Sequence, residues 1–325
     1  MLDRCAGLVF GFLFRDGHAS RLHDEVLAAG LAQGYDWFWL HLALADHRAR
    51  RFLESFEEMP PDARELLVSM EDRIQIHLTA QGGWGILPDL ERDFDDEALG
   101  SGRLGFWLDG NRLITARRHP LRASNALRDV VEMGQLPEGP AQALAKHQEI
   151  FIGLVEKRLS HLSRELARIE DAVLADRGDS SNALGPLRRE LSRYGREFSS
   201  LRSAIHRATG ARNVVAQSPL LEHLPLLQQE SEDFERDAGA LSDRARLLYE
   251  EIETRIASTT NRSLSALTVI STLLLPPTFL VGAFGMNLEG IPWAHSPSGF
   301  AVVFGLCLLL IAGVYILLRR FRILP

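Results

Sequence analysis

With 325 residues, the chain is long enough for two domains, or for one soluble domain with a membrane part. A formal net charge of −7, with no basic patch and no nucleic-acid motif beside it, argues against binding to DNA or RNA. Cys5 and Cys307 lie far apart in sequence and match neither a disulfide framework nor a zinc-ligand spacing. The N-terminal apolar stretch is short and has charges at both ends, so we expect no signal peptide and a cytoplasmic first part.

Strand and helix patterns are mixed along residues 1–140. Residues 7–14 are mostly apolar and predict a buried strand. Alternation of apolar and polar residues predicts half-buried strands at 35–44, 73–81 and 103–118, the last with a hairpin turn at Asp109-Gly110. Residues 46–57 and 61–70 are typical of helices. The pattern predicts a cytoplasmic domain of the α/β or α+β class.

Residues 141–263 change to long helical runs rich in Arg, Glu, Leu and Ala. We expect a helix, a break and a second helix at 140–176, 176–182 and 183–210. A third helix begins near Ser218, and no strong breaker follows from Ser231 until Pro276. If this helix continues to Phe284, the part from Ser231 is about 80 Å long. Such a length is typical of a stalk that carries mechanical or electrostatic information to a membrane.

Two apolar segments near the end of the sequence are each long enough to cross a hydrocarbon core as a helix, 264–284 and 299–318. Arginines precede the first segment and follow the second: Arg255, Arg262, Arg319, Arg320 and Arg322. The connection 285–298 has no Lys or Arg. By the positive-inside rule, both termini and the basic tail 319–325 face the cytoplasm, and the connection is periplasmic. We therefore expect a multi-pass protein of the bacterial inner membrane.

A polar stripe runs along the first apolar segment. Going back from Asn287, it passes through Gly282 and then, in steps that alternate four and three, through Thr278, Leu275, Ser271, Thr268, Leu264 and Asn261. A spacing of about 3.5 residues keeps one helix face toward a neighbour or a central axis. The polar stripe offers oxygen ligands, and in a symmetric ring Leu264 and Leu275 would form hydrophobic constrictions that gate by dewetting.

Two interpretations of the polar stripe stay open on the pattern alone: a pore lining, or close packing between transmembrane helices. Pro276 and Pro277 favour the pore, because they have no N–H groups. The carbonyls of Thr272 and Leu273 therefore lose their helical donors and need water or other polar partners. A hairpin of two spans cannot enclose a conduit by itself, so conduction requires several copies around an axis.

The segment TNRSLSALTVISTLLLPPTFLVGAFGMNLEGIP, residues 260–292, resembles the signature of CorA-type divalent-cation transporters. The GMN triplet at the end of the first of two C-terminal spans is the hallmark of that family. The TNR before the span, NLEGIPW from Asn287 onward and the stretches at 37–53 and 112–121 are most similar to the ZntB branch. Together these resemblances cover most of the chain.

The resemblance implies a funnel-shaped homopentamer whose first spans line one axial pore. Its outer mouth would lie at Gly285, Met286 and Asn287, with the polar stripe as the inner face. In CorA relatives an acidic residue on the stalk helps to bind regulatory cations, and the corresponding position here is Glu250. An ordinary solvated stalk carboxylate explains Glu250 equally well.

The chemistry of this mouth leaves the transported ion open. Asn287 carbonyl oxygens suit a cation that keeps its water shell, whereas zinc prefers His, Cys or carboxylate ligands. The spans contain no His, Asp or Glu, so zinc is favoured by the branch resemblance alone, with magnesium, cobalt, nickel and cadmium as alternatives. The resemblance to the ZntB branch also suggests proton coupling. A proton relay needs an ionisable residue within the membrane, and neither span contains one. Glu289 would form a carboxylate ring that attracts cations, and His295 is a loop metal ligand or simply solvated.

These features predict transport of a divalent cation by a homopentamer embedded in lipid, with no resident cofactor. A membrane-anchored cytosolic sensor or scaffold is the alternative, although an anchor has no use for aligned Thr, Ser and Asn. The sequence gives little support to an enzymatic function. GGWG at 82–85 has no Lys-Ser/Thr after it, and the histidines show no HExxH spacing.

Overall fold

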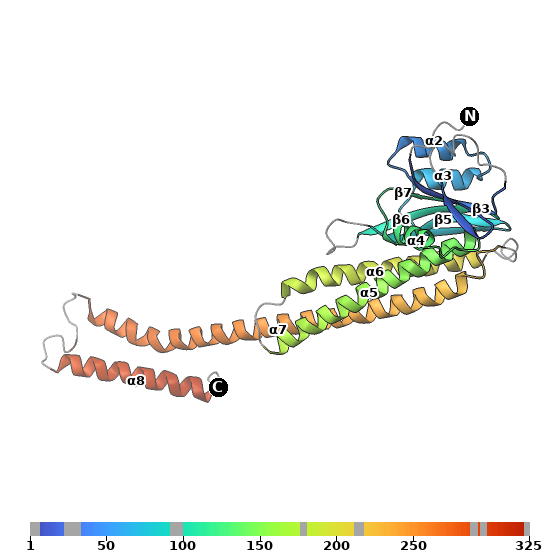
Figure 1. Cartoon of the computed structure of the whole chain (residues 1–325). Helices are drawn as coiled ribbons and strands as arrows, with labels where there is room; N and C mark the ends of the chain where they lie inside the picture. Colours follow the sequence, from blue (N-terminus) through green and yellow to red (C-terminus); the bar gives the residue numbers. More distant parts are fainter. Residues whose placement is uncertain are drawn as a thin grey trace. The chain divides into compact units, whose positions relative to one another are not determined.

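The chain divides into two compact units, Met1–Leu247 and Leu248–Pro325, in its computed structural model (Figure 1). The structure describes residues 7–22, 34–91, 100–175, 181–210, 218–286, 292 and 298–321. The first unit holds a mixed sheet with helices, and the second holds the end of one long helix together with a C-terminal helix.

The sheet of the first unit contains seven described strands in the order β2-β1-β3-β7-β6-β5-β4. Their bounds are β1 Leu8–Arg15, β2 His18–Arg21, β3 Trp37–Ala43, β4 Gln75–Thr79, β5 Gly82–Leu90, β6 Ser101–Leu108 and β7 Arg112–Arg117. Neighbours are antiparallel except β3 and β7, which run parallel. The predicted hairpin turn at Asp109-Gly110 is confirmed, since the N–H of Asp109 donates to the carbonyl of Arg112 at 3.0 Å.

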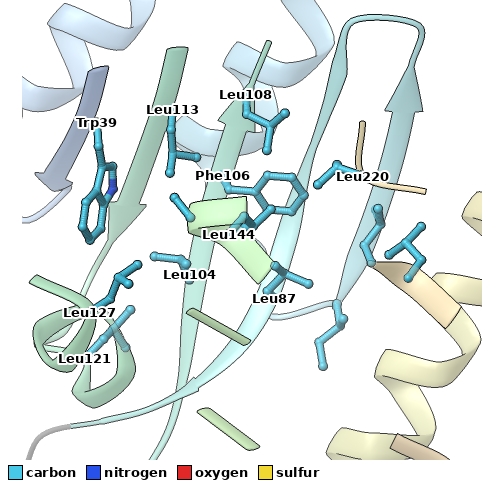
Figure 2. Packing of buried hydrophobic residues seen from close by; sticks show 14 of the residues in the cluster. Trp39, Leu87, Leu104, Phe106, Leu108, Leu113, Leu121, Leu127, Leu144 and Leu220 are labelled. Carbon is cyan, nitrogen blue, oxygen red and sulfur yellow. The ribbon is translucent and has the colours of Figure 1, made fainter. Parts of the chain in front are cut away.

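Helices cover both faces of this sheet. On one face, α2 (His47–Ser55) and α3 (Pro61–Ser69) contribute Leu53 and Leu67 to a core that includes Leu40 of β3. On the other face, α4 (Arg122–Glu132) and α5 (Pro140–Leu174) pack Leu127 and Leu144 against strand residues such as Phe106. Figure 2 shows part of this second core, in which strand residues such as Leu104 and Phe106 lie near Leu127 and Leu144.

The presence of helices on both faces of the sheet makes one prediction from the sequence wrong. A half-buried strand was expected at 35–44, but every residue of β3 except Ala43 is buried. The same holds for the centres of β6 and β7. Central strands with helices on both faces have no solvated side, so both sets of alternating side chains are withdrawn from water. At the sheet edge, β4 keeps exposed and half-buried positions, as expected for a half-buried strand.

Three elements are absent from the sequence prediction: β2, β5 and α4. In β5 the run Gly82-Gly83-Trp84-Gly85 hides the strand pattern, because three of its four residues have no side chain to alternate. A Cβ atom at Gly85 would meet the carbonyl oxygen of Gln75 and the ring of Phe106. The glycine therefore permits a close approach of β4 and β6 to β5 that no other residue allows.

Long helices follow the sheet: α5, α6 (Ser181–Thr209), α7 (Leu224–Phe284) and α8 (Gly299–Arg320). The helices predicted over 140–176 and 183–210 are confirmed within two residues. The predicted break at 176–182 lies partly outside the described residues. Turns occupy 219–223, so α7 begins later than predicted. It is continuous for 61 residues and runs through Pro276 and Pro277, so the stalk and the first apolar segment belong to one helix.

Within the first unit, aromatic contacts and ion pairs join α5, α6 and the first part of α7. The rings of Phe151 and Phe198 lie 6.0 Å apart, and those of Phe198 and Phe234 lie 5.1 Å apart. Arg158 of α5 pairs with Glu190 of α6 at 2.7 Å. Arg202 of α6 in turn pairs with Glu235 of α7 at 2.8 Å, so ion pairs as well as aromatic contacts join the three helices.

Candidate functional site

The polar stripe lies on α7, in the second unit. All seven of its helical members have exposed side chains: Asn261, Leu264, Thr268, Ser271, Leu275, Thr278 and Gly282. Their spacing of four and three residues places them along one face of a helix. α7 ends at Phe284, and Asn287 lies outside the described residues.

The threonine hydroxyls of the polar stripe are bonded to the helix itself. Thr268 Oγ1 donates to the carbonyl of Leu264 at 2.8 Å, and Thr278 Oγ1 donates to that of Leu274 at 2.7 Å. Each hydroxyl proton is used, so the lone pairs of the oxygen remain available to accept hydrogen bonds. A face of this kind presents oxygen acceptors to water or to a hydrated cation.

Two leucines interrupt these polar positions. The side chains of Leu264 and Leu275 are 57% and 68% exposed. They are eleven positions apart, which is three turns of helix, and so they occupy nearly the same face. In any assembly that brings several copies of this face together, each leucine would narrow the space between the copies.

Pro276 and Pro277 lie next to this face inside α7. Neither has an N–H group, so the carbonyls of Thr272 and Leu273 lack the donor that a helix normally supplies four residues later. Carbonyls freed in this way require water or another polar partner when they lie at membrane depth.

Around the polar stripe, the surface of the two apolar segments 264–284 and 299–318 is mostly apolar. On α7, the side chains of Leu267, Ile270 and Phe279 are each more than half exposed. Within the described residues, the most apolar part of α7 has none of its residues buried, and that of α8 has 6% buried. A core helix of a soluble domain would be mostly buried, so the exposure of both long apolar helices is typical of helices that cross a membrane.

The predicted outer mouth lies mostly outside the described residues. Gly285 continues the last turn of α7, with its N–H donating to the carbonyl of Val281 at 2.9 Å, and Met286 is 52% exposed. Asn287, Glu289 and His295 fall outside the residues that the structure describes. Their expected roles at the mouth and in the loop stay predictions.

On the stalk part of α7, Glu250 is exposed, and its backbone carbonyl accepts a hydrogen bond of 2.8 Å from Thr254. Nearby, Glu251 pairs with Arg255 at 2.6 Å, so one of the flanking arginines is engaged in an exposed ion pair. Arg319 and Arg320 form the last turn of α8. Across the described ranges, no three His, Cys, Asp or Glu side chains come together as a ready metal site.

Sequence reasoning missed a buried polar cluster in the first unit. Asp89 of β5 accepts hydrogen bonds from the backbone N–H groups of Ala123 and Ser124, at 2.9 and 3.2 Å, and so caps the N-terminus of α4. The same carboxylate contacts His147 Nε2 of α5 at 3.0 Å. The contact joins residues 58 positions apart, and no local pattern marks it.

A second buried histidine lies in β3. His41 contacts Thr115 Oγ1 through Nδ1 at 2.9 Å and stacks on Phe10 at 4.6 Å between ring centroids. Burial lowers the pKa of His41 well below its usual value, and the charges of Arg117, His147 and Arg128 lower it further. His41 is therefore a neutral structural side chain of the core.

Comparison with known proteins agrees with this arrangement. A family described as CorA-like Mg²⁺ transporter protein matches residues 34–320. Zinc transport proteins named ZntB from Pectobacterium atrosepticum and Pectobacterium carotovorum are 22% and 23% identical to the chain over 296 residues. These cover 87% of this chain and 86% of each relative.

Solved structures resemble the fold as a whole. The full-length CmaX protein superposes with a TM-score of 0.78 at 22% identity, covering 98% of this chain and 99% of that one. The CorA magnesium transporter of Methanocaldococcus jannaschii gives a TM-score of 0.75 at 15% identity, covering 96% and 97%. Both likenesses show the fold: a mixed α/β domain, a long helix and a C-terminal helix. Because the family match spans most of its length, the chain belongs to the CorA-like Mg²⁺ transporter family, as the resemblance of its C-terminal segment predicted.

Proposed function

We propose that the protein carries a divalent metal cation across the bacterial inner membrane through an axial pore lined by α7 from five copies of the chain. Membership of a transporter family establishes metal-ion transport as the activity and sets enzymatic functions aside. The observation that carries the pore is the exposed polar stripe, whose hydroxyl oxygens are free to accept while most other residues of 264–284 are apolar.

In this proposal the cation moves with much of its water shell. Back-bonded threonine oxygens accept hydrogen bonds from that water, and uncharged acceptors hold an ion weakly enough to release it. The carbonyls freed by Pro276 and Pro277 add acceptors at the same depth. Leu264 and Leu275 form apolar constrictions that close the pore by excluding water.

The spans are proposed to be 264–284 and 299–318, with both termini in the cytoplasm. Arg255, Arg262, Arg319 and Arg320 would then lie on the cytoplasmic side, while 285–298 would form the periplasmic loop. Asn287 would ring the outer mouth, and Glu289 would raise the local concentration of cations there. His295 in the loop and Glu250 on the stalk are candidate metal contacts in this scheme.

Zinc is the favoured cation, because the curated relatives that match most of the chain are named zinc transport proteins. Magnesium is the second candidate, supported by the description of the family and by the magnesium transporter that shares the fold. Side chains of the polar stripe do not discriminate between them, since amide and hydroxyl oxygens act on hydrated ions of either kind.

Flux through reconstituted protein tests the proposal. Zinc and magnesium uptake would be measured in liposomes, with and without a pH gradient, for the wild type, Asn287→Ala and the control Ser263→Ala. Ser263 is exposed, and its hydroxyl bonds the carbonyl of Thr259 at 3.1 Å, as the stripe threonines do with theirs. It lies away from the polar stripe around the helix. We expect Asn287→Ala to lose flux and Ser263→Ala to keep it.

Equal flux in the wild type and in Asn287→Ala would remove the proposed role of the amide. Native mass spectrometry in lipid tests the assembly independently. A pentamer is expected, whereas monomers and dimers alone would be incompatible with an axial pore.

A further inference from the structure

The first unit contains a polar groove of about 460 Å³ between α6 and the segment that leads into β4. Its volume lies within the range of small-molecule sites. The lining is mostly polar and includes serines and four arginines from three parts of the fold, which are Arg73, Arg103, Arg196 and Arg207. A ligand of this groove must therefore accept hydrogen bonds and carry negative charge.

One of the four arginines holds the groove together. Arg103 of β6 donates through Nη2 to Glu197 Oε1 of α6 at 2.9 Å, and the two side chains are only 18% and 14% exposed. Its Nε donates to the backbone carbonyl of Asp72 at 2.6 Å. These bonds join β6, α6 and the segment before β4, so the groove is formed before any ligand binds. They also compensate the charge of the Glu197 carboxylate.

The other three arginines are available to a ligand. Arg73, Arg196 and Arg207 are exposed, and none of them makes an ion pair or a side-chain hydrogen bond with a residue that the structure describes. Against them stands one carboxylate in the same condition, that of Asp72. The groove is thus locally cationic on a chain whose formal net charge is −7. Guanidinium groups with free donors bind phosphate oxygens in a bidentate way.

The spacing of the groove residues on α6 favours an elongated anion. Arg196, Ser200, Ser203 and Arg207 follow one another in steps of four, three and four, which places them along one helix face. The two arginines are about 16 Å apart along the helix axis. Between them, the hydroxyls of Ser200 and Ser203 have no hydrogen bond with a described residue and can donate to an anion.

We propose that this groove binds a polyphosphate chain, with Arg196 and Arg207 at its two ends, the serine hydroxyls between them and Arg73 on the opposite side. A single phosphate would reach only part of this row of donors. A metal cation is disfavoured, because three uncompensated positive charges would repel it. The site lies outside the membrane segments, goes beyond cation transport and does not depend on the proposed pore.

Three anions test the proposal: orthophosphate, inorganic triphosphate and ATP. Binding to the full-length protein in phosphatidylcholine nanodiscs would be measured by calorimetry, without divalent metal ions because triphosphate chelates them. We expect triphosphate to bind at least about tenfold more tightly than orthophosphate, since it contacts more of the donors. ATP bound more tightly than triphosphate would identify a nucleotide as the ligand, and equal binding would identify the phosphate chain alone. Both results support the site.

Arginine variants locate the binding. Arg196→Gln and Arg207→Gln should each weaken triphosphate binding about tenfold. The matched control is Arg189→Gln, an exposed arginine two turns before Arg196 on the same face of α6 and outside the groove, which should change nothing.

Two results would overturn the proposal: triphosphate that binds no more tightly than orthophosphate, or an effect of Arg189→Gln as large as that of the groove variants. Melting temperatures of the variants show that the fold is kept. Cation flux measured on the same samples distinguishes failure of this site from failure of the pore.

Discussion

The hydroxyl of Thr268 donates to the carbonyl of Leu264 at 2.8 Å, one turn earlier on α7. This bond makes a polar side chain compatible with an apolar helix, because its proton is satisfied within the helix. The oxygen still faces outward from an exposed position. The same hydroxyl therefore satisfies its proton within the helix and presents an acceptor to the surroundings.

Thr268→Val should slow cation flux, since it keeps the shape of the side chain and removes the oxygen. Each of the five proposed copies loses one acceptor worth about 1 kcal/mol, so flux should fall by at least about fivefold. Thr268→Ser restores the oxygen and should recover most of the flux. Zinc uptake into liposomes checks the prediction at equal protein density. If valine and serine variants behave alike, the hydroxyl has no role in conduction.

Breaking the pair between Arg158 and Glu190 should destabilise the first unit. The two side chains are 17% and 13% exposed and are joined by hydrogen bonds of 2.7 and 2.8 Å. Arg158→Met leaves the largely buried Glu190 carboxylate with only Tyr194 at 3.2 Å and Arg193 at 3.9 Å, and should cost about 2 kcal/mol. A loss of about 4–8 °C in melting temperature follows. Arg236→Met is the control, because its pair with Asp233 is 72% and 53% exposed and should contribute less than about 0.5 kcal/mol. Similar losses in both variants would contradict the importance of burial.

His41 should make the first unit sensitive to acid. Its pKa is lower in the folded protein than in the unfolded chain, chiefly through burial. The unfolded state therefore binds the proton first, and stability falls as the pH drops below the unfolded value of about 6.5. His41→Phe removes this titration and should flatten the dependence between pH 6.5 and the lower folded pKa. Denaturant unfolding at several pH values measures it, with His206→Asn, on an exposed histidine, as the control. An unchanged slope in His41→Phe would refute the assignment.

Alanine should destabilise the fold at Gly85 and have almost no effect at Gly110. At Gly85 the new Cβ would meet the carbonyl of Gln75 and the ring of Phe106, so strands β4 and β6 must move apart. Gly85→Ala should cost about 1–3 kcal/mol. At Gly110 nothing lies within 4 Å of the new Cβ, and Gly110→Ala should change stability by less than about 0.5 kcal/mol. Thermal unfolding of both variants gives the comparison, and equal effects would show that the strand spacing is not tight.

Local patterns in the sequence predicted much of the architecture. Long helices were found because a period near 3.6 persists over many residues, and β1 and the β6–β7 hairpin because their strand patterns end at clear turns. The sequence did not predict strand β5, because its glycines have no side chains that could show an alternating pattern. Half-burial was wrong for β3, since helices on both faces withdraw all of its side chains except that of Ala43.

For the candidate pathway, the sequence by itself determined the apolar lengths, the polar stripe and the position of the prolines, because each depends on neighbours within a few turns of one helix. Only the tertiary structure decided which polar groups are buried together. Asp89, Ser124 and His147 come from three elements, and the polar groove along α6 is lined by residues from α6, β6 and the segment before β4. Contacts between distant segments are set by how the layers pack, and that packing leaves no periodic trace in the chain.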